Sequence, residues 1–323
     1  MLTVTRNHRY DESPEITVSI VTPVYNRKNL LARTFASVRA QTVSCFEHIV
    51  VDDGSIDAPE KVISEYMGQV DYPVTFIQKE NGGVHTARNA ALDIAKGEYT
   101  VFLDSDDELM PEAIESMLSE WSSIPERKSS EYREVCGLVR DENGTLIGTP
   151  FPEGINELEW LDAWAACIHT GGEHFACMRT DVLKDYRLPE PEGVKFVTEA
   201  ILWDRLAKLG YKSWFFNASL RVQHTEGGDH LSSVGTTKKS VQGCVDSLWN
   251  STYLLNEWDI HRGYQFSYLK TLLTYGMMRW ILRIKGIKAA STGGLLRHKD
   301  RAAAAVISPV AFAAAIVYLK KRM

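Results

Sequence analysis

Residues 99–111 read YTVFLDSDDELMP, an apolar run followed at once by three carboxylates within four residues. The run at 99–103 has no helical spacing, which predicts a buried strand. The carboxylates of Asp104, Asp106 and Asp107 would repel one another unless a cation or hydrogen-bond donors compensated their charge. The stretch therefore predicts a strand that presents acidic side chains at a ligand site, with a divalent metal ion as the natural compensator.

Two other interpretations of this acidic cluster are a solvated turn and a calcium-binding loop. The acids of residues 104–115 match several ligand positions of a calcium loop. However, Leu109 stands where that loop needs glycine for its sharp turn, and Pro111 follows, so we reject it. A solvated turn stays open, although a position at the end of a strand argues against it.

The same strand pattern continues on the N-terminal side of this stretch. Strands are predicted at 16–22, 46–51 and 74–78, and helices at 58–67, 84–95 and 111–121, with a further helix that contains Leu31, Phe35 and Val38. Alternating strands and helices predict an α/β fold with a doubly wound, mostly parallel sheet flanked by helices. Towards the C-terminus we expect a hairpin at 134–149, a helix and the short strand SWFF within 196–216, and mostly helix from about residue 240.

Polar clusters follow three of these strands, at residues 22–26, 52–55 and 104–107. Ligands of such sheets bind at the carboxyl ends of the strands, so the three clusters are expected to form one site. Asp53 either binds a base or ribose or caps a turn. Arg88, at a helix start behind the flexible Asn81-Gly82-Gly83, either suits a diphosphate or lies on a helix surface. The chain has no GxGxxG and no GxxxxGK[ST] motif, which argues against a dinucleotide fold and a P-loop.

Composition indicates a globular chain with a sizeable core, since 44% of its 323 residues are hydrophobic and 24% are charged. Five scattered cysteines without CxxC spacing indicate neither a disulfide framework nor a zinc site, and the polar first 15 residues contain no secretory signal, so a reducing cytosol is expected. The net charge of -6 conceals an asymmetry. Residues 1–230 carry 22 Lys and Arg against 38 Asp and Glu, whereas residues 231–323 carry 14 against 4. The basic part is therefore expected to meet an anionic surface.

The succession TPVYNR, VDDGS, NGGVHTARN and FLDSDDELMP resembles the inverting glycosyltransferases of family 2, which have the GT-A fold. The resemblance covers roughly residues 16–225, and the order and spacing of the motifs are more specific than any one alone. It implies a metal-dependent enzyme that uses a nucleotide-activated sugar, with a UDP-sugar as the expected donor. It implies these site residues: Thr22, Pro23 and Tyr25 lining the nucleotide pocket, Asp53 on a uracil-type base, Arg88 near base or phosphates, Asp104 on the ribose and beside the metal, and Asp106 ligating Mn²⁺ or Mg²⁺.

The resemblance also points to a catalytic base. The family places an acidic pair a few residues before a Leu-Trp-x-Arg-Leu helix, and this chain reads TEAILWDRL at 198–206. Aligning the helix puts Glu199 on the second acid, while Thr198 departs from the first. A glutamate that only starts a surface helix is the alternative. His224 follows later, where some relatives place a histidine near the metal or diphosphate, although a lone histidine is more often structural.

The basic C-terminal part predicts membrane contact. Residues 264–288 combine aromatic and aliphatic side chains with five cations and no acid, which indicates an interfacial helix for anionic lipid, with a buried helix as the alternative. Residues 302–319 are uncharged, but they are rich in alanine and contain Pro309, so a segment lying on the membrane is favoured over a spanning one. We therefore expect a cytoplasmic enzyme peripherally associated with the inner face of the cell membrane, acting on a glycan or lipid-linked acceptor and not on nucleic acid.

These expectations give a polar tail at 1–15, a GT-A catalytic domain at 16–230, a basic helical extension at 231–300 and an apolar, membrane-associating segment at 301–323. Two rival functions are weighed against glycosyl transfer. A sugar nucleotidyltransferase would need a Gly-rich basic loop after the first strand, where this chain has Pro-Val-Tyr-Asn. A catalytically degenerate sugar-nucleotide-binding protein would explain why Thr198 and Ala200 depart from the family pattern.

Overall fold

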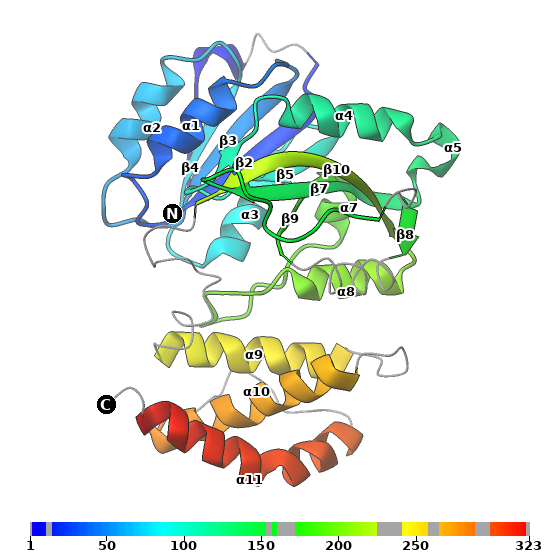
Figure 1. Ribbon diagram of the computed structural model, residues 1–323. Coiled ribbons are helices and arrows are strands. Elements are labelled where there is room, and N and C mark those ends of the chain that lie inside the picture. Colours follow the sequence, from blue (N-terminus) through cyan, green and yellow to red (C-terminus); the bar gives the residue numbers. More distant parts are fainter. Residues whose placement is uncertain are drawn as a thin grey trace. The chain divides into compact units, whose positions relative to one another are not determined.

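The computed structural model describes residues 2–10, 15–152, 157–159, 172–224, 241–257, 265–287 and 298–320. The chain divides into two compact units. The first consists of Met1–Arg187 and Leu202–Glu226, and the second of Leu188–Ile201 and Gly227–Met323. The first unit contains the sheet and the second contains three long helices (Figure 1). The domain boundaries expected at residues 15, 230 and 300 stay predictions.

The described strands of the first unit form one ten-stranded sheet in the order β1-β4-β3-β2-β5-β9-β7-β10-β6, with β8 paired to β10. They are β1 (Thr3–Arg6), β2 (Val18–Val24), β3 (Phe46–Asp52), β4 (Val74–Gln78), β5 (Tyr99–Phe102), β6 (Glu108–Leu109), β7 (Tyr132–Asp141), β8 (Glu157–Glu159), β9 (His174–Arg179) and β10 (Lys212–Gln223). Neighbours β4, β3, β2 and β5 are parallel, and Val21 pairs with both Ile49 and Phe102. The predicted mostly parallel α/β sheet is confirmed.

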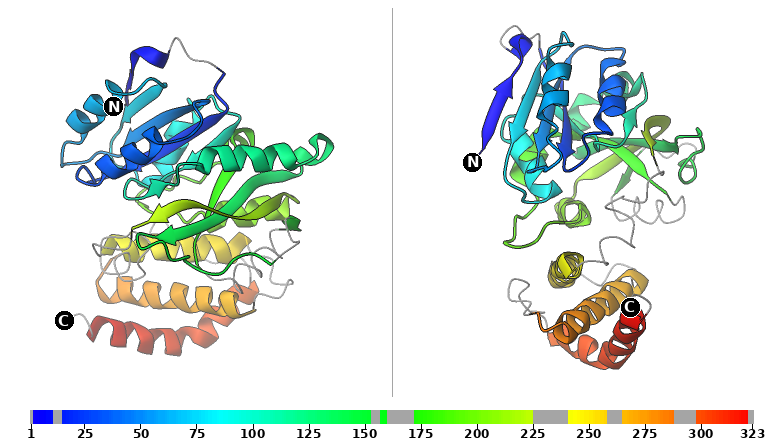
Figure 2. Two further views of the ribbon diagram at one scale, coloured as in Figure 1. Left: turned by 45° about the horizontal axis from the view of Figure 1, so that its top comes forward. Right: turned by 90° about the vertical axis from the view of Figure 1, so that its left-hand side faces the viewer.

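Helices cover both faces of this sheet (Figures 1 and 2). They are α1 (Leu31–Arg39), α2 (Glu60–Met67), α3 (Val84–Leu92), α4 (Ala113–Ser123), α5 (Glu126–Ser129), α7 (Thr180–Asp185) and α8 (Ala200–Lys208). Successive strand residues point to opposite faces. Ile20 and Val50 therefore join the core under α1, α2 and α4, whereas Val21 and Ile49 pack against the alanines of α3. This alternation explains why the strands are apolar throughout.

Several elements differ from the sequence-based expectations. Residues 3–6, expected within a polar tail, form β1 and pair antiparallel with β4. The hairpin expected at 134–149 is reduced to a turn and a single bridge from Arg140 to Leu146, because β7 takes its long pairings from β9 and β10. The helix expected from residue 196 begins at Ala200, and the strand expected as SWFF extends over the twelve residues of β10.

The second unit contains α9 (Val241–Glu257), α10 (Gln265–Ile284) and α11 (His298–Lys320), which confirms the expected C-terminal helices. Leu272, Met278 and Ile281 of α10 share a buried apolar cluster with Ala315 of α11. Within the described residues, one stretch, Asp300–Leu319, is long and apolar enough to cross a membrane.

Candidate functional site

Three loops meet where β2, β3 and β5 end, as the sequence predicted. These strands are adjacent and parallel, so their carboxyl ends lie at one edge of the sheet. The backbone N–H of Asn26 donates to Ser55 Oγ at 2.9 Å, and the N–H of Ile56 donates to Asn26 Oδ1 at 2.8 Å. Arg27 Nη1 donates to Asp106 Oδ2 at 3.0 Å. The loops after all three strands are thus joined by direct polar contacts.

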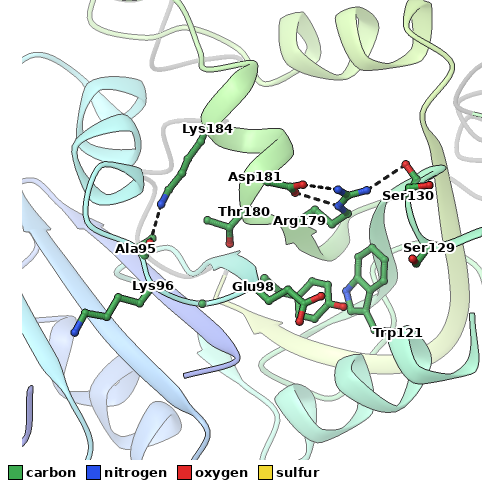
Figure 3. Close-up of a pocket in the computed structure, with 12 residues that line it drawn as sticks. Ala95, Lys96, Glu98, Trp121, Ser129, Ser130, Arg179, Thr180, Asp181 and Lys184 are labelled. Carbon is green, nitrogen blue, oxygen red and sulfur yellow. Dashed lines mark hydrogen bonds and ion pairs between the residues drawn. The ribbon is translucent and has the colours of Figure 1, made fainter. Parts of the chain in front are cut away.

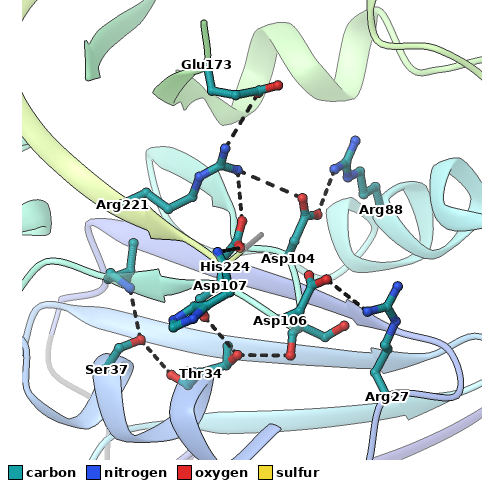
Figure 4. Close-up of polar contacts among 12 residues, drawn as sticks. Arg27, Thr34, Ser37, Arg88, Asp104, Asp106, Asp107, Glu173, Arg221 and His224 are labelled. Carbon is teal, nitrogen blue, oxygen red and sulfur yellow. Dashed lines mark hydrogen bonds and ion pairs between the residues drawn. The ribbon is translucent and has the colours of Figure 1, made fainter. Parts of the chain in front are cut away.

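The acidic cluster is surrounded by arginines from three separate parts of the chain (Figure 4). Arg88 of α3 contacts Asp104 at 3.3 Å, and Arg221 of β10 lies 3.9 Å from the other oxygen of the same carboxylate. Arg27, from the loop after β2, pairs with Asp106. Because guanidinium groups also bind phosphate oxygens, the site combines groups for an anion with groups for a cation. Sequence reasoning identified Arg88 and missed Arg27 and Arg221.

Asp107 differs from its two acidic neighbours because it is buried. Its side chain is 4% exposed, against 43% for Asp104 and 15% for Asp106. Burial raises the pKa of Asp107 to about 7, and the charges of Asp104 and Asp106 add to this rise while Arg221 opposes it. Asp107 Oδ1 accepts the backbone N–H of His224 at 3.2 Å. Asp107 therefore fixes the fold of the cluster, and Asp104 and Asp106 are the acids accessible to a ligand.

Two hydroxyl side chains of helix α1 hold the backbone of the acidic loop. Thr34 Oγ1 lies within hydrogen-bond distance of two loop carbonyls, those of Ser105 at 3.0 Å and Asp107 at 2.9 Å. Ser37 Oγ accepts the N–H of Leu109 at 3.0 Å. The buried face of α1 thus presents hydroxyls as well as apolar groups to the loop, which keeps its backbone polar atoms satisfied.

The carboxylate of Asp53 accepts hydrogen bonds from several groups of the neighbouring loop. Its Oδ1 accepts bonds from Lys79 Nζ at 2.6 Å and from the N–H of Gly82 at 2.9 Å, and its Oδ2 accepts the N–H of Gly83 at 2.7 Å. Gly83 has a φ of +102°, which favours glycine, and a Cβ on Gly82 would approach the hydroxyl of Thr86 to 2.4 Å and displace that side chain. The structure therefore links the two motifs VDDGS and NGG through this carboxylate. Its predicted contact with a base stays a prediction.

The three residues expected to line a nucleotide pocket at the end of β2 differ in how far they are buried. Thr22 is fully buried, with Oγ1 at 2.9 Å from His48 Nε2, and the other ring nitrogen of His48 lies 2.7 Å from the hydroxyl of Tyr66. Burial lowers the pKa of His48 to about 3. Pro23 is also buried, whereas Tyr25 is 47% exposed at the strand end. Of these three side chains, Tyr25 is the one that offers a free surface to a base.

Glu199 lies directly before α8, in the second unit. The preceding segment is anchored by α9. Asp246 Oδ1 accepts the N–H of Lys195 at 2.9 Å, and Asn250 Oδ1 accepts the N–H of Thr198 at 3.0 Å. Both anchoring residues are buried, and burial raises the pKa of Asp246. Sequence reasoning missed these two residues, because polar side chains inside an amphipathic helix give no signal of what they bind.

His224 is close to the acidic cluster but faces a different partner. Its Nε2 lies 2.5 Å from Glu108 Oε1, in the strand β6 that pairs with β10. Glu173, which belongs to the variable stretch around 150–180 where the sequence predicts sugar or acceptor contacts, lies 3.7 Å from the second terminal nitrogen of Arg221. His224 and Glu173 therefore contact residues beside the acidic cluster, Glu108 and Arg221. A metal contact of His224 stays untested.

A separate cavity of about 440 Å³ opens at the other end of β5 (Figure 3). The stacked rings of Tyr99 and Trp121 and the side chains of Arg179, Asp181 and Lys184 line it. Arg179 is paired with Asp181, and Lys184 Nζ donates to a backbone carbonyl at 2.8 Å. These cations serve the fold, and the cavity lies at the opposite end of the strand from Asp104.

The sequence profile described as Glycosyl transferase family 2 matches residues 19–146, the segment that contains all three polar clusters and their arginine partners Arg27 and Arg88. The chain carries a family 2 glycosyltransferase domain. The motifs that carried the resemblance, at the ends of β2, β3, β4 and β5, are thus joined by direct contacts at one edge of the sheet.

Several bacterial glycosyltransferases are similar to this chain. The GalNAc(5)-diNAcBac-PP-undecaprenol beta-1,3-glucosyltransferase of Campylobacter jejuni is 27% identical over 266 residues, which is 81% of each chain. The poly(ribitol-phosphate) beta-glucosyltransferase of Bacillus spizizenii is 30% identical over 72% of this chain and 36% of that protein. Glycosyltransferase GlyA of Streptococcus pneumoniae is 35% identical over 100 residues, and the match spans only 14% of its length.

Solved structures of nucleotide-sugar complexes share the fold. Residues 1–349 of TarS from S. aureus, in complex with UDP-GlcNAc, superpose with a TM-score of 0.56 at 21% identity, covering 83% of this chain and 81% of that one. The mannosyltransferase PcManGT of Pyrobaculum calidifontis, in complex with GDP-Man and Mn²⁺, gives 0.55 at 16% identity, covering 96% and 89%. With the family match, these likenesses confirm the expected GT-A fold.

Proposed function

We propose that this glycosyltransferase is an inverting, metal-dependent enzyme of the hexosyltransferase type that transfers a sugar from a UDP-sugar to an acceptor hydroxyl. The observation that carries the proposal is the set of two accessible carboxylates, Asp104 and Asp106, among three arginines at the carboxyl ends of β2 and β5. A nucleoside diphosphate with a divalent cation needs both kinds of group. The complexes of TarS with UDP-GlcNAc and of PcManGT with GDP-Man and Mn²⁺ support this donor class.

The donor would bind along the edge where the strands end. Tyr25 offers its exposed ring to the base, and the carboxylate of Asp53 positions the loop Asn81–Gly83 beside it. Thr22 and Pro23 contribute the buried wall beneath. Arg88, whose guanidinium lies over the ring of Phe102 at 5.1 Å, would reach the phosphates, and Asp104 would reach the ribose.

Asp106, assisted by Asp104, fits a divalent cation by its chemistry. Both are carboxylates, and hard cations such as Mg²⁺ and Mn²⁺ take oxygen ligands. Among the described residues no group of three or more His, Cys, Asp or Glu side chains is placed to hold a metal, so Asp106 and Asp104 would supply only part of the coordination of an ion. When bound, the ion supplies positive charge that offsets the charge growing on the departing diphosphate.

Glu199 would act as the base. Its carboxylate takes the proton of the acceptor hydroxyl while the acceptor oxygen forms its bond to the anomeric carbon. The bond from that carbon to the phosphate oxygen breaks, and UDP leaves with the electron pair. Attack in line with the leaving group inverts the anomeric centre. Asp246 and Asn250 hold the backbone that carries Glu199, so they are positioning residues.

The decisive experiment measures UDP release from UDP-sugars together with UDP affinity by calorimetry, in the presence of Mn²⁺. Glu199→Gln is expected to abolish turnover and to leave UDP affinity within about twofold, because a base contributes to the transition state rather than to nucleotide binding. Glu192→Gln, an exposed acid of the same segment, is the matched control and should keep full turnover. Retained turnover in Glu199→Gln would show that another group is the base.

The same samples test the rival function and the metal. A wild-type protein that binds UDP-sugars but neither hydrolyses nor transfers them would be a sugar-nucleotide-binding protein. Thermal stabilisation by UDP should depend on Mn²⁺ or Mg²⁺ and disappear on chelation and in Asp106→Asn. Stabilisation by UDP that persists after chelation would contradict the metal role of Asp106.

The acceptor is proposed to be a glycan or a lipid-linked glycan in the synthesis of a bacterial surface polysaccharide or glycolipid. The name of the Campylobacter relative contains an undecaprenol-linked glycan, which supports a lipid-linked acceptor. We also propose that the enzyme acts in the cytoplasm at the inner face of the cell membrane, with the basic C-terminal region as the part that contacts that membrane.

A further inference from the structure

The outward side of α11 is apolar, which is unusual for a helix of a soluble protein. Val306 is 82% exposed, Val310 58% and Val317 54%. We call these exposed residues the outer face; it consists of Ala302, Ala305, Val306, Pro309, Val310, Phe312, Ala313 and Val317. Residues 302–319 contain no charged side chain at all. A surface helix normally places charged residues opposite its buried stripe, so this face is built for an apolar environment.

The opposite side of α11 is packed closely on α10. Ala311 and Ala315 are fully buried, and a Cβ on Gly276 of α10 would approach the Cβ of Ala311 to 2.8 Å. Two hydrogen bonds join the same helices, from Trp280 Nε1 to Ser308 Oγ at 3.1 Å and from the hydroxyl of Tyr268 to Asp300 Oδ1 at 2.8 Å. The two helices therefore form one body, and the orientation of the outer face is fixed relative to α10.

The exposed side of α10 carries cations at its edges. Lys270, Arg279 and Arg283 of α10 and Lys285 directly after it are all exposed, as are Leu269 and Ile284, and residues 264–288 contain no acid. Lys270 and Arg279 stand about 180° apart around the helix, so the cations flank the exposed apolar side chains. We call these four cations the basic row. The guanidinium of Arg283 lies over the ring of Trp280 at 5.3 Å, and that ring contacts Phe312 of the outer face at 4.9 Å. The surface thus passes from cations through a tryptophan to apolar side chains, the order found across the boundary between lipid headgroups and acyl chains.

We propose that the α10–α11 pair lies flat on an anionic bilayer, with the outer face among the acyl chains and the basic row among the headgroups. A spanning arrangement is disfavoured, although Asp300–Leu319 is long enough, because α10 would carry its cations into the hydrocarbon with it. Opposite charge selects anionic lipid over a second copy of this acidic chain, whose net charge is -6. The proposal deepens the membrane association of the proposed function, on which it rests.

The test uses the full chain and vesicles of phosphatidylcholine, with and without phosphatidylglycerol, in co-sedimentation assays. We expect binding to the anionic vesicles and little to the neutral ones. The double variant Val306→Glu/Val310→Glu should lose most binding, because each carboxylate would have to leave water. Leu209→Glu, which changes an exposed leucine of the first unit, is the matched control and should bind as the wild type does.

The contribution of charge is measured separately. Arg283→Gln and Lys285→Gln should each weaken binding to anionic vesicles roughly fivefold, and added salt should reduce the difference. Bound protein should be released by alkaline carbonate, as expected for a helix lying in the interface. Resistance to carbonate would overturn the flat arrangement. Two results would overturn the proposed lipid-binding surface. In the first, the Val306→Glu/Val310→Glu variant binds anionic vesicles as well as the wild type does. In the second, the wild type does not bind vesicles but is a dimer in light scattering, and the same variant loses that dimer.

UDP binding by calorimetry is recorded on the same proteins and separates the two proposals. A protein that binds UDP with Mn²⁺ but not anionic vesicles would overturn the surface and leave the donor site standing. A protein that binds vesicles but not UDP would overturn the donor site and leave the surface. Unchanged UDP affinity and circular dichroism in the glutamate variants would show that they are folded.

Discussion

Replacing Arg27 with methionine is expected to raise the affinity of the nucleotide-free protein for Mn²⁺. Arg27 Nη1 lies 3.0 Å from Asp106 Oδ2, so a cation that takes this oxygen must displace the guanidinium first. Methionine keeps an unbranched apolar stem of similar length and removes the charge. The substitution therefore removes one cation that competes with the metal for this carboxylate.

The size of this effect follows from the burial of the pair. The side chains of Arg27 and Asp106 are 19% and 15% exposed. Hydrogen bonds to charged groups contribute roughly 1.5–3 kcal/mol when buried, and exposed pairs about 0–1 kcal/mol. The free-energy contribution of a mostly buried pair with some solvent screening lies between these values, at about 1.4 kcal/mol. This free energy corresponds to a change of about tenfold in the dissociation constant of Mn²⁺.

The assay follows the signal of free Mn²⁺ by electron paramagnetic resonance as protein is added without nucleotide. Arg39→Met is the control, because Arg39 is an exposed arginine of α1 that donates to Gln69 at 3.1 Å. Asp106→Asn should remove the binding in either background. Equal Mn²⁺ affinity in wild type and Arg27→Met, together with loss in Asp106→Asn, would refute the competition. Binding unaffected by Asp106→Asn would refute the metal site itself.

Three further predictions concern the residues that shape the site. Because burial holds the pKa of His48 at about 3, below its ordinary 6.5, only the unfolded chain takes up this proton as the pH falls from 6.5 towards 3; between pH 7 and pH 5 the free energy of unfolding in urea should fall by about 2 kcal/mol more for the wild type than for His48→Gln, and an equal change in both would contradict the burial of a neutral ring. Gly97→Ala would bring a Cβ to 2.4 Å from the backbone nitrogen of Ser19, so the free energy of unfolding should fall by about 1–3 kcal/mol, and an unchanged value would contradict the close approach. Asp53→Asn removes the charge paired with Lys79 at 2.6 Å, and hydrogen exchange at Gly82 and Gly83 should accelerate about tenfold or more; unaltered exchange would mean that the carboxylate does not hold this loop.

The central strands were predictable because each is an apolar run bounded by turn residues. The strand predicted at 74–78 coincides with β4, and the one predicted at 99–103 ends one residue beyond β5. Buried parallel strands need no polar alternation, so their sequence signal is strong. From there, the position of Asp53 and Asp104 at one edge follows from topology alone.

The outer strands and the arginine partners were not predictable in the same way. The four residues of β1 are all exposed and have no apolar pattern; they form a strand because β4 offers an unpaired edge. Arg221 is more than a hundred residues away from Asp107 in the chain, and nothing in its local sequence reveals that contact. Arg27 was within reach, since it directly follows the polar cluster after the first predicted strand.

The role of Asp53 illustrates a different limit. Its position at a strand end was predicted, but a sequence motif does not say which atoms satisfy a carboxylate. In the structure, its two oxygens accept the amides of Gly82 and Gly83 and the ammonium of Lys79. The motif is therefore a support for the neighbouring loop as well as a candidate ligand contact.

Strand β1 has a practical consequence for handling this protein. Thr3–Arg6 occupies the outer edge of β4, and the side chain of Asn7 fixes the junction by bonds to the carbonyl of Tyr72 and the N–H of Val74. Deleting these residues would expose the backbone donors and acceptors of β4, and strands of other chains could then pair with that edge. A purification tag is better attached through a linker before residue 2, so that β1 keeps its pairing with β4.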